Sequence, residues 1–89
     1  MKTFKLLDYT AQVFYNKEQY YPFCLHLYDN CSGKQLHVGY YISVEQLCYM
    51  THLEMLDHQY HALNPVKTLL AIEEMKEGLY LWMEVLGED

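Results

Sequence analysis

Residues 35–47 read QLHVGYYISVEQL, and the spacing of their apolar side chains changes at Ser43. Every second residue before Ser43 is apolar: Leu36, Val38, Tyr40 and Ile42. This period of two predicts a strand with one apolar face. After Ser43 the spacing becomes helical, with one face formed by Val44, Leu47, Cys48, Thr51 and Met55. Ser43 and Gln46 also match a capping box, so we predict that a strand ends here and a helix begins, over about 44–60.

Two stretches upstream have the same period of two. They cover residues 7–15 and 21–28, and the polar segments 16–19 and 29–34 that separate the strands are rich in turn-forming residues. Strands joined by short turns pair most simply as an antiparallel meander. We therefore predict three antiparallel strands before Ser43.

The C-terminal segment begins with a second helix signal, Asn64-Pro65, which predicts a helix from 65 to about 77. Gly78 then has two interpretations. It is typical of a helix C-cap, after which alternating apolar residues over 79–86 would form a fourth strand. The helical spacing also continues past it, and one glycine costs a helix only about 1 kcal/mol relative to alanine. We favour the strand.

These elements predict an α+β fold. We expect one compact domain over residues 1–89, with a three- or four-stranded antiparallel sheet and two helices packed on one face. The chain has neither internal repeats nor a low-complexity segment that would mark a linker.

Charge excludes several classes of function. The 89 residues include six lysines, no arginine and twelve acidic residues, for a net charge of −6 at pH 7. Recognition of phosphate needs cationic side chains, so we expect no direct binding to nucleic acid. No apolar run reaches the ~18 residues of a membrane span, the start lacks a signal-peptide pattern, and three cysteines cannot all pair within the chain. We expect a cytoplasmic protein that does not bind a membrane.

The negative charge is concentrated in the C-terminal half. Residues 45–89 carry nine acidic side chains against two lysines, whereas residues 1–44 are close to neutral. Glu73, Glu77 and Glu84 line one side of the last segment if it is helical. An acidic ridge of this kind favours a protein partner with a basic surface.

Tyrosine is the main compositional excess, with ten in the chain. Adjacent strand residues face opposite sides of a sheet, so some tyrosines must point away from the core. We place Tyr28 and Tyr41 on that outer face. The helix over 44–60 is also apolar opposite its core side, and both features are typical of protein interfaces. The candidate partner-binding residues are therefore Glu73, Glu77, Glu84, Tyr49, Met50, Leu53, Leu56, Tyr28 and Tyr41.

The histidines suggest a different hypothesis. Pairing Tyr28 with Gln35 across the hairpin sets His26 opposite His37 on the outer face, with Cys24 two residues away on the same side. These three side chains would make the chain a metal- or redox-responsive module. A further group, His52, His58 and His61, lacks the spacing of a zinc peptidase.

The sequence has no catalytic signature, since its four glycines are isolated and its two serines have turn and capping positions. We expect no enzyme activity, no cofactor and no bound metal. The leading hypothesis is a small acidic protein-binding module that acts by surface occlusion. Size and acidity are typical of phage or mobile-element inhibitors of nucleic-acid-processing complexes, such as anti-defence proteins of the anti-CRISPR type. The remaining alternative is a homodimer through the 44–60 helix, as an accessory subunit without its own activity.

Overall fold

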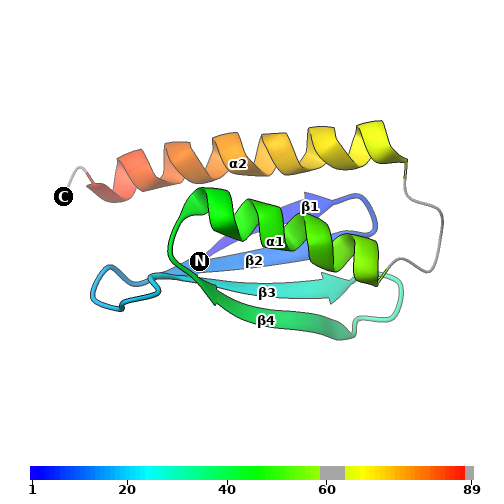
Figure 1. Ribbon diagram of the computed structural model, residues 1–89, viewed down its shortest axis with the longest axis horizontal. Coiled ribbons are helices and arrows are strands. Elements are labelled where there is room, and N and C mark those ends of the chain that lie inside the picture. Colours follow the sequence, from blue (N-terminus) through cyan, green and yellow to red (C-terminus); the bar gives the residue numbers. More distant parts are fainter. Residues whose placement is uncertain (59–63, 88–89) are drawn as a thin grey trace.

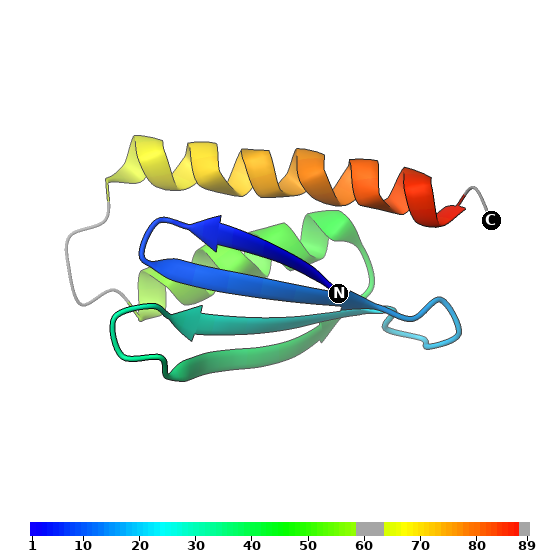
Figure 2. The same ribbon diagram turned by 180° about the vertical axis from the view of Figure 1, so that it is seen from behind.

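A computed structural model of the chain describes residues 1–58 and 64–87, and it shows four strands followed by two helices (Figure 1). The elements are β1 (Lys2–Leu6), β2 (Tyr9–Tyr15), β3 (Phe23–Asp29), β4 (Gln35–Tyr41), α1 (Val44–Asp57) and α2 (Pro65–Gly87). The strands form one antiparallel sheet in the order β1-β2-β3-β4. α1 packs on β3 and β4, and α2 packs on α1 and β1. Within residues 1–58 and 64–87, no helix covers the opposite face of the sheet (Figure 2). The antiparallel sheet with two helices confirms the predicted α+β fold.

β1 is a strand that the sequence pattern did not separate from its neighbour. We predicted one strand over 7–15, but Leu7 and Asp8 form a tight turn that pairs Leu6 with Tyr9. Leu7 has a φ of 59°, in the left-handed region that tight hairpin turns use. The alternation of apolar residues runs through this turn without a glycine or proline, which is why the pattern hides it.

The start of α1 follows the predicted capping box. The backbone N–H of Gln46 donates to Oγ of Ser43 at 3.1 Å, and the Gln46 side-chain oxygen accepts from the N–H of Ile42 at 2.8 Å. Two amides that the helix itself cannot pair are thus satisfied. The helix ends at Asp57, three residues before the predicted end, and Tyr60 lies outside the described residues.

α2 runs through Gly78 as one helix, so the predicted strand over 79–86 is wrong. Asn64 caps the start, because its Oδ1 accepts from the N–H groups of Val66 and Lys67 at 3.1 Å each. A Cβ at residue 78 would lie 2.7 Å from Cε1 of Phe4 in β1. The glycine therefore permits close packing of the helix on the strand rather than ending the helix. One buried stripe continues on both sides of it: Thr68, Ile72, Met75 and Leu79.

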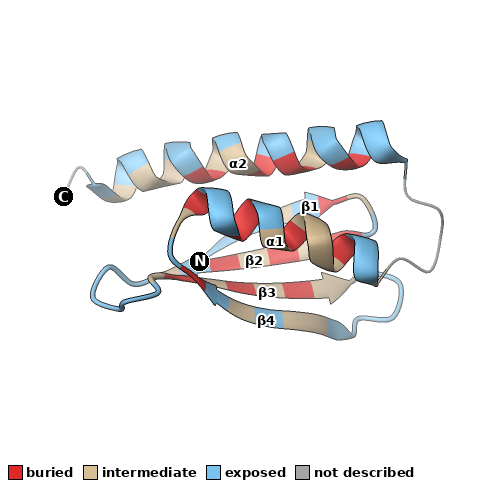
Figure 3. Cartoon of the chain, in the orientation of Figure 1, coloured by how far each residue is buried: buried red, intermediate tan, exposed pale blue. Residues whose placement is uncertain are grey.

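The core lies between the helices and the sheet face that they cover (Figure 3). The apolar side chains with at most 2% exposure are Leu6, Ala11, Val13, Leu25, Leu27, Leu47, Met55, Met75 and Leu79. Each fully buried side chain of leucine or methionine size contributes about 1.5–3 kcal/mol relative to an exposed one. These side chains come from β1, β2, β3, α1 and α2, and Tyr41 adds a contribution from β4, so every element supplies the core.

From His37 onward the faces of β4 are the reverse of those we predicted, whereas Leu36 packs against the core as predicted. A β-bulge between Leu27 and Tyr28 shifts the register, so His37 pairs with Leu27 rather than His26. One extra residue in a strand moves every later side chain to the other face. The exposed residues are in consequence Val38, Tyr40 and Ile42, whereas Tyr41, which we placed outside, is 6% exposed and belongs to the core.

The inward face of β4 carries a polar cluster that includes Tyr41. The hydroxyl of Tyr41 lies 2.5 Å from Nε2 of His37, and Nδ1 of His37 lies 3.5 Å from a carboxylate oxygen of Glu54 in α1. Gly39 stands between the two rings, and a Cβ there would collide with both of them. The second oxygen of Glu54 lies 3.4 Å from Nε2 of His58. This cluster joins β4 to α1 and pairs polar groups that burial would otherwise penalise.

Candidate functional site

The structure brings together two predicted site residues that the sequence placed in separate surfaces. Tyr49 of α1 and Glu73 of α2 line one groove between the two helices, with a volume of about 310 Å³. We call it the acidic groove; it is lined by Glu45, Cys48, Tyr49, His52, Leu69, Ile72, Glu73 and Lys76. Tyr49 is 64% exposed and Leu69 is 51% exposed, so both apolar surfaces are available to a partner.

A hydrogen bond between the helices fixes one end of the acidic groove. The hydroxyl of Tyr80 in α2 donates to the carboxylate of Glu45 in α1. This contact lowers the pKa of Glu45, with a smaller contribution from Lys76, and raises the pKa of Tyr80 to about 12. Glu45 is therefore ionised at neutral pH, and the groove keeps its negative charge there.

The predicted acidic ridge exists because α2 is continuous. Glu73, Glu77 and Glu84 are exposed and stand at helical spacings of four and seven residues, which places them on one side of α2. Glu73 lines the acidic groove, and the other two extend the same side toward the C-terminal end. Glu74 is also exposed but points about 100° away around the helix.

The other predicted residues of α1 differ in exposure. Leu56 is 42% exposed, whereas Met50 and Leu53 are half-buried, and Met50 packs against the core. The helix is thus apolar on two sides, as predicted, but only part of the second side is free.

Sequence reasoning missed Leu69 and Tyr80, because their positions beside α1 depend on how the two helices cross.

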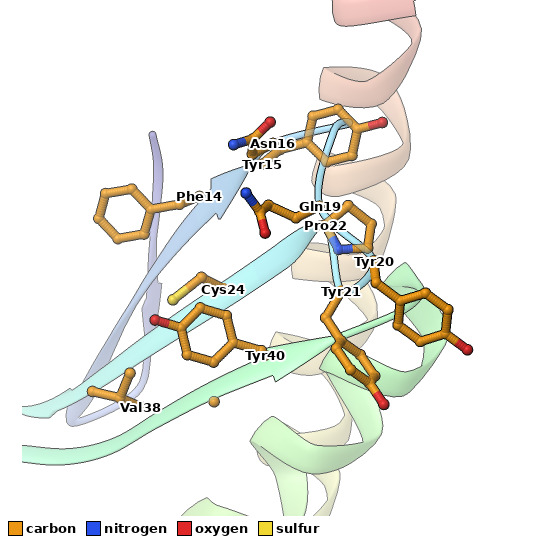
Figure 4. A pocket seen from close by; sticks show the side chains of 11 residues that line it. Phe14, Tyr15, Asn16, Gln19, Tyr20, Tyr21, Pro22, Cys24, Val38 and Tyr40 are labelled. Carbon is orange, nitrogen blue, oxygen red and sulfur yellow. The ribbon is translucent and has the colours of Figure 1, made fainter.

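The uncovered sheet face carries a second concave surface (Figure 4). It is a pocket of about 880 Å³ between the 16–22 segment and the outer sides of β3 and β4. The lining is aromatic and uncharged: Phe14, Tyr15, Asn16, Gln19, Tyr20, Tyr21, Pro22, Cys24, Val38, Gly39 and Tyr40. Tyr28 lies on this face outside the pocket, with its hydroxyl 3.5 Å from Nδ1 of His26. Tyr40 takes the outward position that we assigned to its neighbour Tyr41.

The proposed grouping of Cys24, His26 and His37 does not form. Cys24 and His26 lie on the uncovered face, whereas His37 faces α1, so the sheet separates them. Burial raises the pKa of Cys24, and a hydrogen bond with Tyr40 only partly offsets this. The thiol is held in its protonated form, opposite to the shift that activates a cysteine nucleophile.

Of the second histidine group, only His52 and His58 fall among the described residues. His52 lines the acidic groove, His58 pairs with Glu54, and His61 lies outside the described residues. Over residues 1–58 and 64–87, no three side chains of His, Cys, Asp or Glu are grouped to hold a metal ion.

Comparison with protein-family models, curated proteins and solved structures gives no match to this chain. No helix in the described ranges combines the length and the apolar character needed to cross a membrane.

Proposed function

We propose that this chain is a protein-binding module and that the acidic groove, with the ridge of Glu73, Glu77 and Glu84, is its binding site. The observation that carries the proposal is the continuity of α2 past Gly78, which keeps Glu84 on the same side of the helix as Glu73, the residue that lines the acidic groove with the exposed Tyr49 of α1. A strand in place of the second half of α2 would have separated Glu84 from the other two carboxylates.

The chemistry of the acidic groove favours a macromolecular partner over a small ligand. It is small, at about 310 Å³, and its lining combines exposed apolar surface from Tyr49 and Leu69 with acidic side chains. Aromatic anchors surrounded by polar groups are typical of protein interfaces. The carboxylates of Glu45 and Glu73 select a partner with lysine or arginine side chains at matching positions.

A basic surface patch is the electrostatic footprint of a nucleic-acid-binding protein. The acidic groove would then compete with phosphate for the same cationic side chains, and the chain would act by surface occlusion. This is the mode of action expected of a phage or mobile-element inhibitor of a nucleic-acid-processing complex, and we propose it for this protein. No catalytic step is required of any side chain in this mechanism.

Two charge-matched variants test the site. The first combines Glu73→Lys, Glu77→Lys and Glu84→Lys; the second combines Asp8→Lys, Glu18→Lys and Glu74→Lys, which are exposed and lie off the ridge. A partner captured from a lysate with the wild-type chain is purified, and its Kd is measured for all three proteins. Three exposed charge contacts at about 0.2–1 kcal/mol each predict a roughly tenfold loss for the first variant.

The second variant separates contact from overall charge. It has the same net charge as the first. If both variants lose the same affinity for the partner, only long-range attraction matters, and the acidic groove and its ridge are not the binding site. Unchanged affinity in the first variant would place the interface elsewhere. Tyr49→Ala tests the apolar part, and nucleic acid added as a competitor tests whether the partner surface is a phosphate-binding one.

A further inference from the structure

The two edges of the sheet differ in their protection. β1 is a short edge strand with Lys2 and Lys5 in it, and α2 packs beside it. β4 is a seven-residue edge strand, and no charged residue occurs between Gln35 and Val44. Among the described residues no segment lies beyond β4 in the sheet (Figures 1 and 2). Lysine on an edge strand discourages pairing with another chain, so β1 is protected from such pairing and β4 is available for it.

Apolar side chains follow the open edge. Val38 and Tyr40 are 40% and 65% exposed on the face that the helices leave uncovered, and Ile42, just beyond the end of the strand, is 50% exposed. Their counterparts one strand inward, Cys24 and His26, are half-buried. The bulge between β3 and β4 produces this row, because it turns Val38 and Tyr40 outward instead of into the core.

We propose that β4 pairs antiparallel with β4 of a second copy of this chain, joining two four-stranded sheets into one. The pairing follows from a two-fold axis perpendicular to the sheet, which keeps both helical layers on the same side. Backbone N–H and C=O groups on the free side of one β4 bond those of the other. The two apolar rows then meet on the uncovered face.

A second copy fits this edge because self-pairing brings identical residues together. Identical charged strands would repel each other, and β4 has no charged side chain to do so. On the helical side, the carboxylate of Glu54 in α1 is paired, with its oxygens 3.5 Å from Nδ1 of His37 and 3.4 Å from Nε2 of His58. β4 itself carries no Asp, Glu, Lys or Arg, whereas the acidic groove lies on the other flank of α1, toward α2.

The experiment measures mass in solution by light scattering after size exclusion, over a range of micromolar concentrations. The wild-type chain is expected at about twice its mass of 10.7 kDa. Val38→Lys places a charge at the pairing edge and is expected to leave a monomer. Thr3→Lys, an outward position on the opposite edge strand, is the matched control and is expected to remain a dimer.

Circular dichroism of each variant establishes that it is folded. Ile42→Lys, just beyond the end of β4, is the substitute if Val38→Lys does not fold, and it is expected to dissociate the dimer as well. A wild-type monomer at the highest concentration overturns the proposal. So does a dimer that survives both lysine substitutions but is lost in Leu53→Lys, because that result would place the contact on α1.

Discussion

Replacing Gly78 with alanine tests why α2 continues through a glycine. Two effects oppose each other in this variant. Alanine favours the helix interior by about 1 kcal/mol relative to glycine. The new methyl group would also lie 2.7 Å from Cε1 of Phe4 and 3.4 Å from its Cζ. Insertion of a methyl group into a packed contact costs about 1–3 kcal/mol. The net expectation is destabilisation by about 0–2 kcal/mol, in place of the gain that helix propensity alone predicts.

The two effects separate when Phe4 is shortened. In a Phe4→Ala background the ring is absent, so Gly78→Ala is expected to stabilise the protein by about 1 kcal/mol. A double-mutant cycle by urea denaturation measures the difference, and a coupling of about 1–3 kcal/mol between residues 4 and 78 is expected. Gly87→Ala is the control, because a Cβ there meets nothing within 4 Å and its effect should not depend on Phe4.

Equal stabilisation by Gly78→Ala in both backgrounds would refute this account. It would mean that α2 does not lie against β1 at this point, and Gly78 would have no packing role. The continuity of α2, and with it the alignment of Glu73 with Glu84, would then lose its structural explanation.

Two further predictions concern stability. Burial raises the pKa of Cys48 from 9.0 to about 11, so the folded chain retains a proton there that the unfolded chain releases. The contribution of the Cys48 thiol to stability is therefore fully present below pH 9.0 and is lost as the pH rises toward about 11. Cys48→Ala should reduce this loss, which is measured by comparing urea midpoints at about pH 8 and about pH 10.5. Ser43→Ala and Asn64→Ala each remove a helix cap and should cost about 1 kcal/mol in the same assay, and an effect below a few tenths would contradict the capping geometry.

Local signals in the sequence predicted β2, β3, β4, the start of α1 and the start of α2, but neither β1 nor the second half of α2. The change of period at Ser43, its pairing with Gln46 and the Asn64-Pro65 start all involve residues within one helical turn of each other. Such contacts depend on the chain nearby, and propensity is informative there. The α+β class followed from these elements and short turns, without knowledge of the packing.

The two main errors arose where distant residues decide the structure. In the sequence Gly78 is typical of a helix end, but in the structure it allows the close approach of Phe4, which is far from it in the chain. The bulge in β4 depends on how the hairpin closes, with the N–H of Asp29 donating to the carbonyl of Lys34 at 2.9 Å. No local pattern distinguishes Tyr40 from Tyr41 as the outward residue, so one extra residue exchanged them. The acidic groove was only partly predicted for the same reason: Tyr49 and Glu73 were identified as candidates, but the side-by-side packing of α1 and α2 that joins them with Leu69 was not.

The two proposed surfaces, the acidic groove and the β4 edge, are compatible in one symmetric dimer. The acidic groove lies between α1 and α2, whereas the pairing edge is β4, on the opposite flank of α1. A dimer joined through β4 would leave both acidic grooves open, and a two-fold axis perpendicular to the sheet would place them on the same side. A partner with two basic sites on one surface could then engage both grooves, and the second contact would form at a high effective concentration. Val38→Lys should in that case weaken binding to such a partner, although Val38 lies outside the acidic groove. A single-site partner should bind this variant and the wild type equally.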